Sequence, residues 1–306
     1  MKVYSIFDDY SSEAVEIIKE ACIDLTVHPK GVQRPDHDLM KKILEQYDCI
    51  IIGTSQKITE DMFENVDSPK VIATASVGID HIHIPCSKVD LIKIINTPKA
   101  NAQSVAEYTI GCALNCCKRI IEGRRLYQKG INNKSLSKKP EDLSGRLMGV
   151  VGAGNISKRI IEYARFFGMD IICWTPHPDN HKDLLNLNVS FVDLDELLKN
   201  ADVISVNLPN KRETINIISS DRIALMKNDA VFISVSRIAT MDYRSLINKA
   251  DKNPNFYICL DIDVDEDVVS AASDLSNVII TPHIAGGTIE TRKRMFIELA
   301  EHIIKL

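Results

Sequence analysis

Short apolar runs rich in β-branched residues recur along the chain and are separated by stretches with helical periodicity. In the first third of the sequence, these runs predict strands at 2–7, 23–29, 49–54, 70–76 and 91–98. The runs are continuous rather than alternating, which is typical of parallel strands that are buried on both faces. An amphipathic pattern at 37–47 predicts a helix between two of them. The pattern therefore indicates an α/β unit.

A second series of the same kind fills the rest of the chain. It follows a long predicted helix at 102–128 and a polar segment at 129–145, which we expect to be an extended connection because it lacks periodicity. Apolar runs then predict strands at 147–152, 170–175, 189–193, 202–208, 230–236, 257–262 and 278–282. The last residues, 286–306, predict an amphipathic helix. The chain thus reads as two α/β units.

Length, charge and cysteine content narrow the class of protein. A chain of 306 residues is long for one core, so two domains are expected. A net charge of -5 gives no electrostatic reason to expect nucleic acid or an anionic membrane as a partner. No apolar run approaches the roughly 20 residues that span a bilayer. The eight cysteines form no C-x-x-C pair, which suits a reducing cytoplasm, and we predict no metal site.

The stretch "VVGAGNIS" at 150–157 resembles a dinucleotide-binding turn with one substitution. Gly152 and Gly154 follow an apolar strand and precede a predicted helix, but Ser157 stands where the G-x-G-x-x-G pattern has its third glycine. Gly152 permits the tight turn, and Gly154 lets the backbone approach a pyrophosphate at the helix N-terminus. We assign Asn155 and Ile156, which open the helix, to the same cofactor site.

The residue that would choose between NAD and NADP is irregular. About 20 residues after the glycines, at the end of the next strand, a carboxylate normally receives the ribose hydroxyls of NAD. Thr175 occupies that position, and no arginine stands beside it to receive a 2′-phosphate. The nearby cationic candidates are His177, His181 and Lys182. The cofactor is therefore expected to be NAD or NADP, with the choice left open.

Seven segments in order resemble the D-isomer-specific 2-hydroxyacid dehydrogenases over nearly the whole chain. They are "ATASVGIDHI", "INTPKANAQSVAEYTIG", "GVVGAGNIS", "VNLPNKRETINII", "VFISVSRIATMD", "LDIDVDED" and "TPHIAGGT". The resemblance implies two doubly wound parallel-sheet domains. A flavodoxin-like substrate domain would cover 1–100, completed by the helix at 286–306, and a Rossmann cofactor domain would cover 101–285. It also implies a homodimer formed through the helix and connection after Ala100.

The same resemblance implies which residues perform the reaction. Arg237 would bind the substrate carboxylate and polarise the 2-oxo group, His283 would exchange the hydroxyl proton, and Glu266 would hydrogen-bond that imidazole. The backbone N–H groups of Val77 and Gly78 would also meet the carboxylate of a small 2-oxo or 2-hydroxy acid. The cofactor residues implied in addition are Pro209 and Asp261.

Two departures and two rival functions accompany this interpretation. Ile238 replaces the glycine that usually follows the arginine, and the proline that usually follows Glu266 is absent. A formate- or phosphite-type dehydrogenase shares the fold, but the formate enzymes carry glutamine at the position of Glu266. A dinucleotide-sensing corepressor also shares the fold and retains the three catalytic residues, so the sequence leaves that alternative open.

Overall fold

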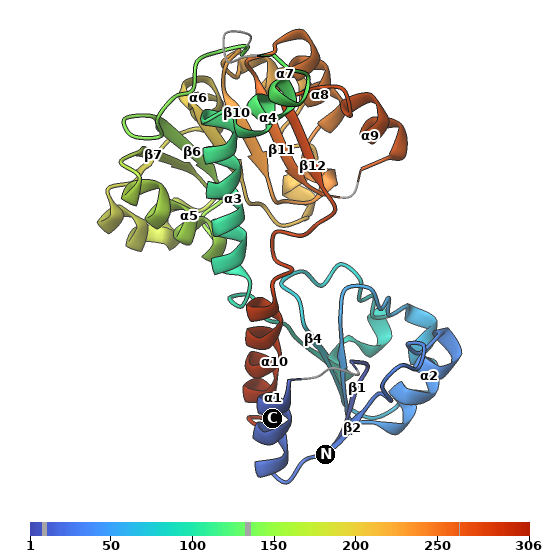
Figure 1. Cartoon of the computed structure of the whole chain (residues 1–306). Coiled ribbons are helices and arrows are strands. Elements are labelled where there is room, and N and C mark those ends of the chain that lie inside the picture. The colour runs from blue at the N-terminus through green and yellow to red at the C-terminus, as the bar shows by residue number, and fades with distance from the viewer. Residues whose placement is uncertain (8–10, 132–135, 263) are drawn as a thin grey trace. The chain divides into compact units, whose positions relative to one another are not determined.

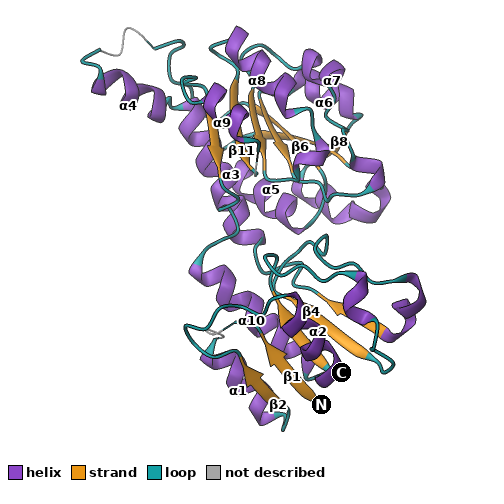
Figure 2. Cartoon of the chain, turned by 90° about the vertical axis from the view of Figure 1, so that its right-hand side faces the viewer, coloured by secondary structure: helices purple, strands orange, loops and turns teal. Residues whose placement is uncertain are grey.

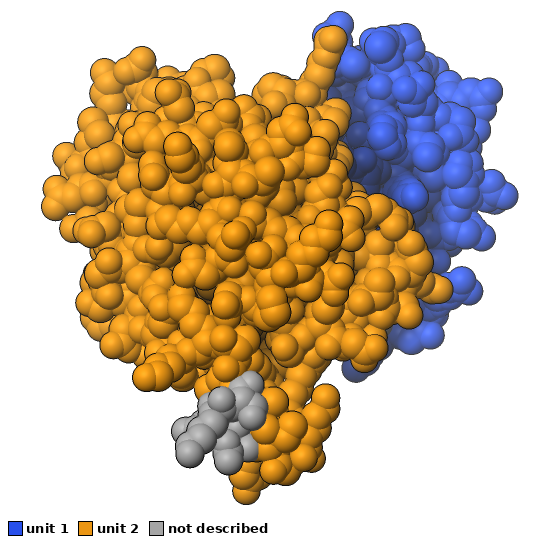
Figure 3. All heavy atoms as spheres, turned by 90° about the horizontal axis from the view of Figure 1, so that it is seen from above, with its two compact units in different colours: residues 1–101, 288–306 blue, residues 102–287 orange. Residues whose placement is uncertain are grey.

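The computed structural model describes residues 1–7, 11–131, 136–262 and 264–306. Part of the predicted connection, 132–135, and Asp263 lie outside these described residues. The chain divides into two compact units, coloured separately in Figure 3. Unit 1 comprises Met1–Asn101 with Thr288–Leu306, and unit 2 comprises Ala102–Gly287.

Unit 1 is built on a five-stranded parallel sheet with the strand order β2-β1-β3-β4-β5 (Figures 1 and 2). Its strands are β1 (Lys2–Ser5), β2 (Asp24–Val27), β3 (Cys49–Ile52), β4 (Lys70–Thr74) and β5 (Ile92–Ile95). This is the flavodoxin-like order. The central strand β3 is buried along its whole length, as its continuous apolar sequence predicts.

The helices of unit 1 come from both ends of the chain. They are α1 (Ser12–Glu20), α2 (His37–Gln46), α10 (Ile289–Ile303) and the short 3-10 helices η1 (Glu60–Phe63) and η2 (Cys86–Leu91). The C-terminal helix α10 packs on α1 and buries Phe296, Leu299 and Ile303 in the same core as the sheet. The last residues of the chain therefore complete the first unit.

Unit 2 contains a seven-stranded parallel sheet with the order β12-β11-β10-β9-β6-β7-β8. The strands are β6 (Leu147–Val151), β7 (Asp170–Trp174), β8 (Ser190–Phe191), β9 (Val203–Val206), β10 (Val231–Ser234), β11 (Tyr257–Asp261) and β12 (Val278–Thr281). The order reverses next to β6, which is the switch point of a Rossmann fold. The predicted fold class, two doubly wound parallel sheets, is confirmed.

Helices cover both faces of the second sheet (Figure 2). In β10, Val231 and Ile233 join the core beneath the helices at 102–117 and 155–166, whereas Phe232 joins the core beneath those at 194–200, 220–225 and 243–252. Successive side chains of a strand point to opposite faces of the sheet. Because helices cover both faces, apolar side chains are needed at every position of such a strand. The helices are α3 (Ala102–Cys117), α4 (Ile120–Gln128), α5 (Asn155–Phe166), α6 (Leu194–Asn200), α7 (Ser220–Leu225), α8 (Tyr243–Lys252) and α9 (Glu266–Ala272), with 3-10 helices η4 (Pro178–Leu187), η5 (Arg212–Thr214) and η6 (Ile238–Thr240).

The single long helix predicted at 102–128 is wrong, because the structure has two helices there. Arg119 separates α3 from α4 with a left-handed φ of 56°. Its guanidinium carbon lies 4.1 Å from the centre of the Tyr257 ring, and the side chain is buried. The amide of Ile121 then donates to the side chain of Asn115. Tertiary contacts thus break a helix that local propensity would continue.

Candidate active site

The site residues predicted in unit 2 follow its strands at one edge of the sheet. Because the strands are parallel, all of their carboxyl ends meet at that edge, where doubly wound proteins bind ligands. The residues that stand at strand ends or just beyond them are Gly152 and Gly154 (β6), Thr175 (β7), Pro209 (β9), Arg237 (β10), Asp261 (β11) and His283 (β12). Glu266 stands further on, at the start of α9.

The glycine turn has the geometry of a dinucleotide-binding loop. Gly152 has a φ of 102° and donates its N–H to the carbonyl oxygen of Trp174 at 2.8 Å. A Cβ atom on Gly152 would lie 2.8 Å from the carbonyl oxygen of Asn207, so glycine is required there. A Cβ atom on Gly154 would meet nothing within 4 Å. That open space precedes Asn155 and Ile156 at the start of α5, whose first amides can receive an anion.

Ser157 fills the position of the missing third glycine. Its side chain is fully buried in the first turn of α5. Within the described part of the chain, its hydroxyl oxygen has no hydrogen-bond partner. The substitution therefore keeps the packing and leaves one polar group unsatisfied.

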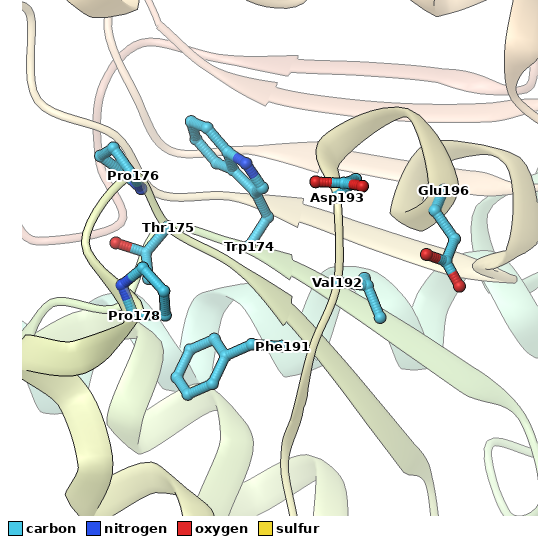
Figure 4. Close-up of a pocket in the computed structure, with 8 residues that line it drawn as sticks. All are labelled: Trp174, Thr175, Pro176, Pro178, Phe191, Val192, Asp193 and Glu196. Carbon is cyan, nitrogen blue, oxygen red and sulfur yellow. The ribbon is translucent and has the colours of Figure 1, made fainter.

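A hollow of about 510 Å³ opens at the end of β7 (Figure 4). It is lined by Trp174, Thr175, Pro176, Pro178, Phe191, Val192, Asp193 and Glu196. The two carboxylates stand at the start of α6, across Trp174 from Thr175 in Figure 4. Among the described residues that line this hollow none is basic, and His177, His181 and Lys182 are not part of its wall. The acidic side chains that line this hollow therefore come from the start of α6 and not from the end of β7.

Arg237 is half-buried at the end of β10, just before η6. Its carbonyl oxygen accepts from the amide of Thr240 at 3.0 Å and from the Thr240 hydroxyl at 2.7 Å. The preceding Ser236 accepts from the amide of Leu208 at 2.8 Å and donates to Val206, so it joins the ends of β9 and β10. Ile238 lies in the helical η6 and is not in the left-handed region, so no glycine is required there.

His283 is exposed on a tightly held loop after β12. Its backbone has a φ of 53°, and its N–H donates to the carbonyl oxygen of Thr281 at 2.9 Å. The following amides of Ile284 and Ala285 donate to the two carboxylate oxygens of Asp261, each at 2.7 Å. Asp261 was predicted to bind cofactor, and the structure places its carboxylate beneath the histidine loop.

Glu266 is exposed and is the first residue of α9, rather than part of an irregular loop. Its acidic neighbours Asp265 and Asp267 both pair with Arg244, at 2.8 and 3.0 Å. In the part of the chain that the structure describes, no hydrogen bond joins Glu266 with His283. The pairing of this carboxylate with the imidazole stays a prediction.

In unit 1, the loop after β4 presents two backbone N–H groups. The carbonyl oxygen of Val77 accepts from the side-chain amide of Asn96 at 2.7 Å, and that of Gly78 accepts from the Ser76 hydroxyl at 2.6 Å. Across the described ranges, the N–H groups of Val77 and Gly78 have no acceptor. The carbonyl oxygen of Ser76 also accepts from the amide of Thr97 at 2.9 Å. Each carbonyl shares its peptide plane with the N–H of the next residue, so the bonded carbonyls of Ser76 and Val77 fix the directions of the Val77 and Gly78 N–H groups.

No described helix has the length and apolarity needed to cross a membrane. Nor do the described residues contain a group of three or more histidine, cysteine, aspartate or glutamate side chains placed to hold a metal ion.

Known proteins share this fold. A family model for the NAD-binding domain of D-isomer specific 2-hydroxyacid dehydrogenases matches residues 110–285. A hydroxypyruvate reductase of Thermotoga maritima is 33% identical over 274 residues, which cover 88% of each chain. A D-lactate dehydrogenase from Aquifex aeolicus, solved with NAD and lactic acid, is 26% identical with a TM-score of 0.80, over 99% of this chain and 94% of that one. An acyclic imino acid reductase in complex with NADPH and D-Arg is 25% identical with a TM-score of 0.85, over 99% and 96%.

The Rossmann sheet, the glycine turn and the residues along its edge define a nicotinamide-dependent oxidoreductase. The family match spans more than half of the chain, and the reductase of Thermotoga maritima is similar over most of its length. The chain therefore belongs to the D-isomer specific 2-hydroxyacid dehydrogenase family. Its class reaction is hydride transfer between a nicotinamide cofactor and C2 of a 2-hydroxy or 2-oxo acid.

Proposed function

We propose that this protein interconverts a small 2-oxo acid and the D-2-hydroxy acid, with Arg237, Glu266 and His283 as its catalytic residues. The observation that carries the proposal is the position of Arg237 and His283 at the edge of the sheet of unit 2. Arg237 and His283 follow β10 and β12, the two neighbours of β11, on the same edge as the glycine turn. The nicotinamide ring would supply or accept the hydride, and the chain would hold the acid and move the proton.

Each side chain has a role that suits its chemistry. The planar guanidinium of Arg237 would bind the carboxylate through two parallel hydrogen bonds and polarise the 2-oxo group. His283 would donate the proton to the oxygen on C2 during reduction and remove it during oxidation. Glu266 would accept a hydrogen bond from that imidazole and fix its orientation. Because Asp265 and Asp267 are engaged with Arg244, Glu266 is the carboxylate we assign.

The loop after β4 in unit 1 is also assigned to the substrate. We propose that the N–H groups of Val77 and Gly78 donate to the substrate carboxylate. The support is that the carbonyls of Ser76 and Val77, which share peptide planes with these two N–H groups, are bonded to Thr97 and Asn96, whereas the two N–H groups have no acceptor among the described residues. Asn96→Ala is then expected to raise KM for the acid about tenfold with little change in kcat, since it frees one peptide plane.

We infer that NADH is preferred over NADPH. The hollow at the end of β7 carries Asp193 and Glu196, and two carboxylates repel the charge of a 2′-phosphate. We expect kcat/KM to be at least about tenfold higher for NADH than for NADPH. A difference of only about 1.4 kcal/mol between the two cofactors produces that ratio. Glu196→Gln should reduce the ratio of kcat/KM for NADH to kcat/KM for NADPH. Asp170→Asn, at the other end of β7, should leave that ratio unchanged. Equal use of both cofactors by the unaltered protein would contradict this inference.

We also propose a homodimer and a cytoplasmic location. The α4 helix exposes Ile120 and Tyr127, the latter 84% exposed, in the region that was expected to form the dimer. All eight cysteines are free thiols, as a reducing compartment would keep them. Light scattering should give twice the monomer mass, and Tyr127→Lys should shift it toward the monomer. A monomer at micromolar concentration would contradict the assembly.

The experiment that tests the function follows the oxidation of NADH and of NADPH, separately, against a panel of 2-oxo acids. Turnover with at least one acid, producing the D-isomer, is expected. Glu266→Gln should slow it about 100-fold while Asp267→Asn, the matched control, leaves it nearly unchanged. His283→Ala should abolish reduction and leave cofactor affinity intact. Tight cofactor binding with no turnover on any acid would instead support the dinucleotide-sensing alternative.

A further inference from the structure

A chain of three hydrogen bonds links the loop after β4 to an imidazole a few residues further on. Thr74 ends β4, and both Thr74 and Ser76 are buried. The Ser76 hydroxyl donates to the carbonyl oxygen of Gly78 at 2.6 Å. Thr74 Oγ1 lies 2.9 Å from Ser76 Oγ and 3.0 Å from His81 Nε2. The chain therefore connects the side chain of His81 with the backbone of Gly78.

The carbonyl at the end of this chain fixes the direction of every hydrogen bond in it. The carbonyl oxygen of Gly78 can only accept, so Ser76 gives its one hydroxyl hydrogen to Gly78. The Thr74 hydroxyl must then donate to Ser76, and it has no second hydrogen for His81. His81 Nε2 therefore carries a proton and donates it to Thr74 Oγ1.

The backbone of His81 is held against the core of unit 1. Its carbonyl oxygen accepts from the amide of Ile58, and the amide of His83 donates to the carbonyl oxygen of Ile58, both at 2.9 Å. Ile58 and Ile82 form a parallel bridge, and both of their side chains are buried in the core. His81 thus stands on a rigid support, which is what a group that positions a binding loop requires.

The chain completes the fixing of Gly78. The N–H of Gly78 shares a peptide plane with the carbonyl of Val77, which accepts from Asn96. The carbonyl of Gly78 belongs to the next peptide plane and accepts from Ser76. Hydrogen bonds therefore hold the peptide planes on both sides of Gly78, and the second of them depends on the chain that begins at His81.

We propose that His81 is a positioning residue for the substrate: its Nε2–H holds, through two hydroxyls, the conformation of Gly78 in which this loop binds the carboxylate of the 2-oxo acid. The inference rests on the proposed role of the Val77 and Gly78 N–H groups. Without a donor at position 81, Thr74 is free to accept from Ser76, and the Gly78 carbonyl then loses its partner. Loss of His81 should therefore act on the binding of the acid more than on the chemical step.

Thr74→Val and Thr74→Ser test the middle of the chain. Valine keeps the branched shape at this buried position and removes the hydroxyl. We expect KM for the best acid to rise about tenfold, as for the loss of one hydrogen bond, with kcat changed less than about twofold. Serine restores the hydroxyl and should rescue KM. Thr26→Val, on β2 of the same sheet, is the matched control and should leave KM unchanged. Equal KM values for the valine and serine variants, or a fall in kcat at constant KM, would overturn the proposal.

His81→Gln and His81→Leu test the first donor, and they serve as well if the valine variant does not fold. Glutamine can present a side-chain N–H to Thr74, whereas leucine has no donor. His81→Leu should raise KM for the acid several-fold, and His81→Gln should raise it less. A leucine variant with the KM of the unaltered protein would contradict the assignment of His81.

The protonated nitrogen of His81 can be identified without turnover. Nitrogen-15 magnetic resonance, with the His81 signals assigned by their absence in His81→Gln, should show the proton on Nε2 at about pH 8, where a free imidazole is neutral. A neutral imidazole with its proton on Nδ1 would overturn the proposal even in an active enzyme. Absence of activity in the unaltered protein would count against the proposed function, and the imidazole signals would still decide the direction of the chain.

Discussion

Substitution of the two glycines of the cofactor turn by alanine separates folding from binding. Gly152 has a φ of 102°, and its added methyl would lie 2.8 Å from the carbonyl oxygen of Asn207. Gly154 has an ordinary φ of -76° and open space around it. Gly152→Ala should therefore destabilise unit 2, whereas Gly154→Ala should fold normally and lose affinity only for the cofactor.

The magnitudes follow from the backbone and the contact. A strained φ costs about 1–3 kcal/mol, and the clash adds about 1–3 kcal/mol. Restriction of the unfolded chain offsets about 0.4–1 kcal/mol, so Gly152→Ala should lower the free energy of unfolding by about 1–5.6 kcal/mol. For Gly154→Ala, the poorer helix cap costs about 0.5–1 kcal/mol. Restriction of the unfolded chain offsets nearly all of this cost, so the free energy of unfolding should hardly change.

Urea unfolding followed by circular dichroism measures the first effect, and titration of NADH fluorescence measures the second. Gly154→Ala should raise the Kd for NADH about tenfold or more, because its methyl occupies the space a pyrophosphate would use. If Gly154→Ala bound NADH as tightly as the unaltered protein, the assignment of this turn would be refuted. If Gly152→Ala unfolded at the same urea concentration as the unaltered protein, the steric reasoning would be refuted.

Three further changes have expected outcomes. Ser157→Ala removes a buried, unsatisfied hydroxyl and should raise the free energy of unfolding by about 1 kcal/mol in urea titrations. Arg237→Lys should lower kcat/KM about 30- to 100-fold, because lysine cannot bind a carboxylate bidentately. Hydrogen bonds from the hydroxyl and then the amide of Ser245 lower the pKa of Asp242, which caps α8. That stabilisation is present above about pH 4 and is lost as the pH falls through the lowered pKa, so Asp242→Ala should cost about 1 kcal/mol near pH 7 and less near pH 3.

The pattern of apolar runs predicts all twelve strands of the described residues, because parallel strands in sheets covered on both faces leave a continuous local signal. The break at Arg119 left no such signal. Its cause is the ring of Tyr257, more than a hundred residues further along the chain. A helix that ends for a tertiary reason cannot be recognised from its own sequence.

In the candidate site, too, some features can be recognised from the local sequence and others only from the fold. Its glycines, Arg237 and His283 are recognisable because each follows a strand within a short motif. The hydrogen bonds that Asp261 accepts are not, because their donors stand at the end of another strand and in the loop after it. Asn96, which fixes the peptide plane after Val77, was missed for the same reason. For Asp261 and Asn96, the available sequence signal was a position at the end of a strand or directly after it.

The central claim, that the chain transfers a hydride to C2 of a 2-oxo acid, is tested most directly by an isotope. The protein is incubated with NADH deuterated at the transferring position of the nicotinamide and with the best acid of the panel. Nuclear magnetic resonance and chiral separation then locate the deuterium and assign the isomer. The account predicts deuterium at C2 of the D-2-hydroxy acid, and none in a His283→Ala control. Product without deuterium at C2, or the L-isomer, would contradict it.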